Sequence, residues 1–154
     1  MKKVFIACPM HGKSIRYIDL VRKQVSLAVS LLYDEKIEIL DQVHIAETAD
    51  IVAMEERKLR TYRLGRSIQI LGQADLAIFA DEYATANGCR VEKFICKTYQ
   101  IPYKMYSEII ANLKKDPFKW KQFRQLVNTT YDLISNINSS TTDIASNNNN
   151  SSTT

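Results

Sequence analysis

Three carboxylates are the side chains of this chain best suited to chemistry. Glu92 lies in the first turns of a helical pattern, beside its apolar face, and Asp75 and Asp81 flank the most apolar run of the chain. A fixed, ionised carboxylate beside a cleft is what nucleophilic attack on a sugar C1′ requires, and a second carboxyl group can protonate a leaving base or orient the sugar. The alternative is a purely structural role, in which Glu92 complements the helix dipole and both aspartates are turn residues.

Residues 7–14 (Ala-Cys-Pro-Met-His-Gly-Lys-Ser) form a second candidate site. The Gly-Lys-Ser ending has the relaxed spacing of a P-loop, in which backbone N–H groups surround a phosphate. No glycine stands between Ala7 and Gly12, so a tight phosphate nest would force other residues into costly backbone conformations. Two milder interpretations stay open: a loop and helix N-terminus that hold an anion or ligand hydroxyls, or a turn with Ser14 as helix cap.

The cysteines allow a third reading, in which Cys8, His11 and Cys89 bind zinc. A fourth ligand is missing, so we expect no metal and interpret Cys8 and Cys96 as small buried hydrophobic residues. Three widely spaced cysteines argue against a disulfide framework and predict a reduced, cytoplasmic setting.

The elements that must position these residues alternate along the chain. Short apolar runs predict strands, and apolar residues at helical period predict the segments between them as helices. This order predicts an α/β fold with a parallel sheet, helices on both faces and an extra C-terminal helix, and ligands then bind at the carboxyl ends of the strands. Strands are expected at 3–7, 37–40, 76–80 and 103–106, and helices at 15–33, 51–73, 88–100, 107–113 and 117–134.

Length and composition predict one folded domain with a tail. The 154 residues fit a single domain, and the mild net charge of +4 suits an anionic small ligand or simple solubility and is weak evidence for nucleic-acid binding. Residues 1–135 form the expected domain, and residues 136–154, rich in Asn, Ser and Thr, are expected to be disordered. No apolar run approaches the ~20 residues of a membrane span, so we expect no membrane partner. The basic run at 57–66 is interpreted as a solvated face or subunit contact.

Residues 4–13 (Val-Phe-Ile-Ala-Cys-Pro-Met-His-Gly-Lys) resemble the opening of small proteins of the nucleoside 2-deoxyribosyltransferase superfamily. Residues 64–68 (Leu-Gly-Arg-Ser-Ile), 74–79 (Ala-Asp-Leu-Ala-Ile-Phe) and 86–92 (Ala-Asn-Gly-Cys-Arg-Val-Glu) match later signatures of this group in the same order. The resemblance covers about residues 3–106, and its Gly-Cys-Arg-Val-Glu element is fairly specific.

This resemblance implies a three-layer flavodoxin- or Rossmann-like fold and cleavage or transfer at the N-glycosidic bond of a nucleoside or nucleoside monophosphate. It places the covalent nucleophile on Glu92, the proton partner of the base on Asp75 and, more loosely, the orientation of the sugar on Asp81. It implies no cofactor and a homo-oligomer whose sites a neighbouring subunit completes. A non-catalytic nucleotide-binding module and a P-loop kinase or NTPase remain as alternative functions. The expected substrate-binding residues are Cys8, Pro9, Met10, Gly12, Lys13, Ser14, Ser67, Asn87 and Gly88.

Overall fold

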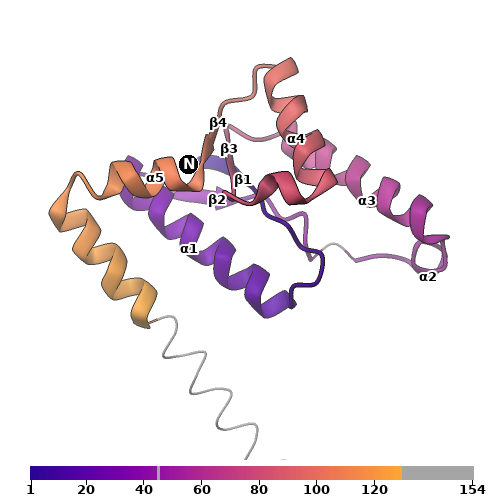
Figure 1. Ribbon diagram of the computed structural model, residues 1–154, viewed down its shortest axis with the longest axis horizontal. Helices are drawn as coiled ribbons and strands as arrows, with labels where there is room; N and C mark the ends of the chain where they lie inside the picture. Colours follow the sequence, from indigo (N-terminus) through magenta and orange to yellow (C-terminus); the bar gives the residue numbers. More distant parts are fainter. Residues whose placement is uncertain (45, 130–154) are drawn as a thin grey trace, which may run out of the picture.

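The computed structural model describes residues 1–44 and 46–129, and it alternates strands with helices as the sequence predicts (Figure 1). Its last helix occupies residues 117–129 of the described chain. The predicted disordered tail, residues 136–154, lies outside the described residues. The labelled elements are β1 (Lys2–Ala7), α1 (Ile15–Tyr33), β2 (Ile37–Ile39), α2 (Ala49–Val52), α3 (Glu56–Leu71), β3 (Leu76–Phe79), η1 (Tyr83–Thr85), α4 (Asn87–Thr98), β4 (Tyr103–Met105) and α5 (Tyr106–Leu113).

The four strands form one parallel sheet in the order β2-β1-β3-β4, which confirms the predicted α/β class. The central strands are aligned with Val4 beside Leu76 and Ala7 beside Phe79. The chain leaves β1 toward one edge of the sheet and returns to add β3 on the other side. The topological switch point therefore lies between the carboxyl ends of β1 and β3, where open α/β sheets bind ligands.

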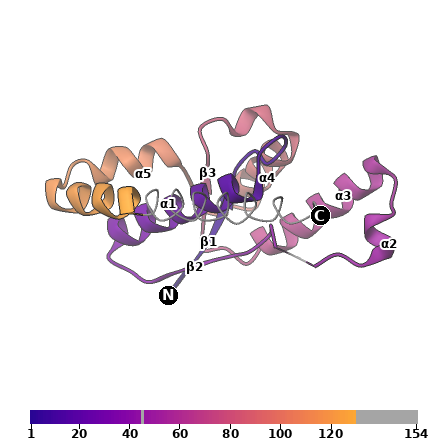
Figure 2. The same cartoon turned by 90° about the horizontal axis from the view of Figure 1, so that it is seen from below.

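Helices cover both faces of the sheet, so the fold has three layers (Figure 2). On one face, α1, α5 and the helix at 117–129 bury a cluster that includes Val29, Ile78 and Ile109. On the other face, α3 and α4 pack over Phe5 and Phe79. Alternate residues of the central strands point to opposite faces, and both faces are covered by helices. Every residue from Val4 to Ala7 in β1 and from Leu76 to Phe79 in β3 is therefore apolar and buried.

The prediction of one helix over 51–73 was wrong in its first part. The chain forms the short α2, leaves helical conformation after Val52 and starts α3 at Glu56. Only Leu71, at the far end of α3, is buried, because the residues of its first turns carry no continuous apolar stripe. Figures 1 and 2 show α2 and the beginning of α3 extending away from the sheet.

Two predicted helix starts are confirmed by their caps. Ser14 accepts a hydrogen bond from the Tyr17 amide at 3.2 Å, and Asp116 accepts from the amides of Phe118 and Lys119 at 3.0 and 3.1 Å. Such caps satisfy amide groups that have no partner inside the helix. Among the helices of the described residues, none combines the length and apolar content needed to cross a membrane.

Candidate active site

Glu92 is the buried carboxylate of this fold, with 6% of its surface exposed. It lies on the inner face of α4 together with Cys89 and Cys96, at the three- and four-residue spacing that brings side chains onto one helical face. The Ser67 hydroxyl, from α3, donates a hydrogen bond to Glu92 Oε1 at 2.6 Å. Two helices that are separate in sequence are thus joined by one polar contact under the surface.

Burial raises the pKa of the Glu92 carboxyl, and the hydrogen bonds from Ser67 and Cys89 oppose that rise. Removal from water disfavours the charged form, whereas donors to the carboxylate favour it. The Cys89 thiol can act as a donor because burial, followed by the nearby Glu92 charge, raises its pKa to about 12. The site therefore combines an ionisable group with two neutral donors that stabilise its charged form.

The Cys8 thiol, at the carboxyl end of β1, is affected by the charge of this carboxylate. The residue follows directly after β1 and is partly buried. Burial raises the pKa of the Cys8 thiol, while Arg22 lowers it and the Glu92 charge raises it. The charges of Arg22, in α1, and of Glu92, in α4, therefore both act on the thiol at the end of β1. Of the predicted site residues, Ser67 and Glu92 are joined by a hydrogen bond, and the Glu92 charge acts on Cys8.

The loop from Pro9 to Ser14 is held by local contacts at the start of α1. The Lys13 amide donates to the Met10 carbonyl at 3.0 Å, and Gly12 has a φ of 72°, a conformation that glycine adopts without strain. The Lys13 ammonium lies 4.9 Å from the centre of the Tyr17 ring. Together with the Ser14 cap, these contacts engage the lysine and the serine within the loop and the first turn of α1.

Asp75 is not brought together with Glu92. Its carboxylate accepts a hydrogen bond from the Lys3 amide at 2.7 Å, at the amino ends of β1 and β3. The four residues of β3 separate it from the carboxyl edge by ~13 Å at the usual rise of a strand. In this position Asp75 satisfies a backbone group at the start of the sheet.

Asp81 lies at the carboxyl end of β3 but is turned toward α5. Its Oδ1 accepts from the Ser107 hydroxyl at 2.6 Å, so this aspartate connects β3 to the beginning of α5. The remaining predicted residues, Asn87 and Gly88, begin α4, and a Cβ on Gly88 would lie 3.8 Å from the Leu64 side chain. Gly88 therefore lies where α4 and α3 face each other.

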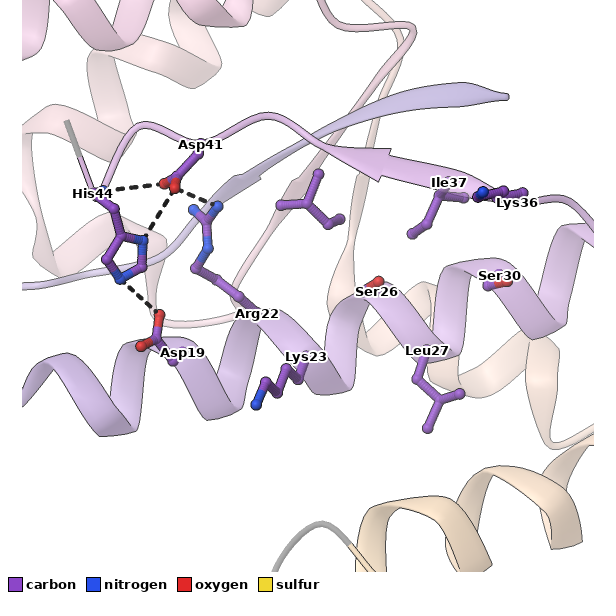
Figure 3. A pocket seen from close by; sticks show the side chains of 11 residues that line it. Asp19, Arg22, Lys23, Ser26, Leu27, Ser30, Lys36, Ile37, Asp41 and His44 are labelled. Atoms are coloured by element: carbon purple, nitrogen blue, oxygen red, sulfur yellow. Dashed lines mark hydrogen bonds and ion pairs between the residues drawn. The ribbon is translucent and has the colours of Figure 1, made fainter. Parts of the chain in front are cut away.

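Sequence reasoning missed Arg22, the buried cation of α1, which is 8% exposed. Figure 3 shows its guanidinium beside Asp41 in the loop after β2, with Arg22 Nη2 3.3 Å from Asp41 Oδ1. The same guanidinium donates to Gln42 Oε1 at 2.9 Å and to the Leu40 carbonyl at 3.3 Å. Gln42 in turn donates to the Ile6 carbonyl at 2.6 Å. This chain of contacts fixes the carboxyl ends of β1 and β2 against α1. Its sequence signal was a charged residue four positions after Ile18, on the apolar stripe of the helix.

The same loop carries His44 between two carboxylates. Its Nδ1 lies 3.1 Å from Asp41 Oδ2, and its Nε2 lies 3.3 Å from Asp19 Oδ1 on α1 (Figure 3). Partial burial raises the pKa of Asp41, but the backbone hydrogen bonds from His44 and Val43, the Arg22 charge and the His44 side chain together lower it below its ordinary value. The loop is thereby held to the first half of α1.

Glu92 lines neither of two grooves on the surface of the described residues. One, of about 580 Å³, runs between α1 and β2, and the other, of about 560 Å³, lies along the exposed face of α3. Among residues 1–44 and 46–129, no group of three His, Cys, Asp or Glu side chains is arranged to hold a metal ion.

Comparison of the chain with family models, with curated proteins and with solved structures gave no match.

Proposed function

We propose that this protein cleaves or transfers the N-glycosidic bond of a nucleoside or nucleoside monophosphate, with Glu92 as the nucleophile. The observation that supports this proposal most is the surroundings of Glu92: it is a buried carboxylate held by Ser67 and Cys89, and its charge acts on Cys8 directly after β1. A carboxylate fixed in this way is preorganised to attack a single carbon.

The reaction would proceed by two displacements. A Glu92 carboxylate oxygen bonds to C1′ while the C1′–N bond breaks, and its electron pair leaves with the base, which takes up a proton. A water molecule or a second base then attacks C1′, the glycosyl ester breaks, and the Glu92 carboxylate is regenerated. Two inversions at C1′ give net retention. Asp81, on the carboxyl edge, is better placed than Asp75 to face the sugar, since Asp75 is bonded to Lys3 at the opposite edge.

The test is a chromatographic screen of nucleosides, nucleoside monophosphates and NAD for released base. With a substrate found, Glu92→Gln is expected to lower kcat by at least about 10³-fold, because removal of a nucleophile eliminates the covalent path. The matched control is Glu82→Gln, the same chemical change at an exposed position after β3. Wild-type turnover by Glu92→Gln would overturn the proposal.

A second candidate, a nucleotide-binding module without catalysis, is favoured by one observation. The burial that raises the pKa of Glu92 also limits its access to a sugar, and no second carboxylate is bonded to it among the described residues. In this case calorimetry detects nucleotide binding, while the same screen detects no released base.

A further inference from the structure

The free edge of β2 carries unused backbone groups. In a parallel ladder, alternate residues of a strand bond to the neighbour on each side. The Lys36 carbonyl accepts from the Lys2 amide, and the Leu40 amide donates to the Val4 carbonyl, so the even-numbered residues bond to β1. Ile37 therefore turns its N–H and C=O groups away from β1, at one edge of the sheet formed by the described residues.

The side chains on this edge have a self-complementary order of charge. Lys36 and Glu38 lie on either side of Ile37 and point to the same face of the strand, since side chains alternate. Within the part of the chain that the structure describes, neither forms an ion pair. If a second β2 ran antiparallel with Ile37 opposite its own copy, Lys36 would face Glu38 of the second copy, and Glu38 would face Lys36.

Backbone geometry permits this register, and charge favours it over the register centred on Glu38. Ile37 opposite Ile37 forms the type of antiparallel pair in which both residues exchange N–H···O bonds, and these are the groups that face outward. A register centred on Glu38 would instead place two carboxylates opposite each other, which destabilises a pair.

The groove between α1 and β2 provides room for the partner. Ile37 and Ile39 line it from the strand, and the small side chains of Ser26 and Ser30 line it from α1 (Figure 3). An antiparallel partner would place its own Ile37 beside the first, on the same face of the extended sheet and over this groove. The partner would thereby cover apolar surface that is half-buried in one chain.

The opposite edge of the sheet lacks this complementarity. The only charge within β4 is Lys104, so a second copy paired antiparallel about this residue would meet the same positive charge. A single-sign charge on an edge strand is a known protection against pairing, whereas opposite charges two residues apart permit one defined register.

We propose that β2 is a dimerisation surface that binds β2 of a second copy of this chain. The two four-stranded sheets would then be related by a two-fold axis and form one continuous sheet. The contact is isologous, so it closes at the dimer. A strand of three residues and one groove bury less than the ~1,600 Å² of a standard interface, and the dimer is expected to dissociate on dilution. This proposal does not depend on the chemistry of Glu92.

Charge reversal in the full chain tests the proposal, with sedimentation velocity over a concentration series as the measurement. Lys36→Glu creates two like-charged contacts by symmetry, as does Glu38→Lys, and each is expected to raise the dimer dissociation constant by about tenfold. An equimolar mixture of the two variants is expected to restore dimers, because each reversed residue then meets an opposite charge. The double variant K36E/E38K is expected to dimerise like the wild type.

The matched control is Lys104→Glu on β4, which leaves the dimer unchanged. Urea unfolding of each variant separates a loss of association from a loss of folding, since the mixture restores association only between folded chains. A wild-type chain that stays monomeric over the series, dimers insensitive to both reversals, a mixture that fails to recover, or open-ended assemblies would each overturn the proposal.

Discussion

At the scale of single residues, Glu92 is held where its charged form is costly. Burial raises the pKa of this carboxyl in the folded protein, while in the unfolded chain it ionises in the ordinary range of a glutamate. Between these two pKa values the folded state binds more protons than the unfolded state, so stability falls as pH rises through this window. Above the folded pKa the cost of keeping Glu92 charged is fully present.

Glu92→Gln is therefore expected to stabilise the fold while removing activity. The free energy of unfolding should increase by about 1 kcal/mol at pH 7 to 8, the usual size of gains at strained functional positions. The gain should shrink as pH falls toward the ordinary range of a glutamate, because the wild-type carboxyl is then neutral as well. Urea unfolding at a series of pH values measures both. A destabilised variant at every pH would mean that the charge of Glu92 contributes to folding.

Ser67 is a positioning residue for the same carboxylate. Its hydroxyl lowers the pKa of Glu92 against the effect of burial, so Ser67→Ala should move the acid limb of the kcat/KM profile to higher pH. Thr61→Ala on the exposed side of α3 is the control, since the Thr61 hydroxyl donates to the Arg57 carbonyl within the same helix and not to Glu92. A profile that drops in height without moving along the pH axis would show that Ser67 acts by packing alone.

At the scale of elements, the two ends of β3 are held by different contacts. The amino end is tied to β1 by Asp75, whose carboxylate accepts the Lys3 amide, and the carboxyl end is tied to α5 by Asp81 and Ser107. The direction of a parallel sheet sets this division, because all loops that can meet a ligand leave from one edge.

Asp75→Ala is expected to act on stability and not on chemistry. The variant leaves the Lys3 amide without its acceptor, and the free energy of unfolding should fall by about 1 kcal/mol. Base release from a substrate found in the screen should keep its kcat. Urea unfolding and steady-state kinetics on one preparation test both parts. A fall in kcat of at least tenfold with an unchanged free energy of unfolding would contradict this prediction and assign Asp75 to the catalytic site.

At the scale of the whole molecule, the sheet separates two apolar layers. On one face the Arg22 contacts join α1 to the loop after β2, and on the other face the Ser67–Glu92 contact joins α3 to α4. The molecule thus has one buried cation and one buried anion among its described residues, on opposite faces of the sheet. The free edge of β2 is separate from these contacts and is the surface through which we propose that two copies of the chain associate.

The sequence alone determined the class of fold and most of the elements. Apolar runs at Val4–Ala7 and Leu76–Phe79 are long enough only for strands, and the helical period of α1, with Ser14 as its cap, located that helix with its observed bounds. These signals are local, because hydrophobic period and capping depend on neighbours in the chain. The break between α2 and α3 was missed because Ala53 and Met54 carry no turn signal.

Only the tertiary structure decided which candidate residues meet. Asp75 and Glu92 looked like partners in sequence, yet Asp75 accepts the Lys3 amide at the amino ends of β1 and β3, while Glu92 is bonded to Ser67 of α3. Ser67 and Glu92 come from different helices, and they meet because α3 and α4 pack on the same face. Arg22 is buried because the loop after β2 supplies its acceptors. Contacts of this kind depend on how the layers are stacked, and local sequence pattern does not contain that information.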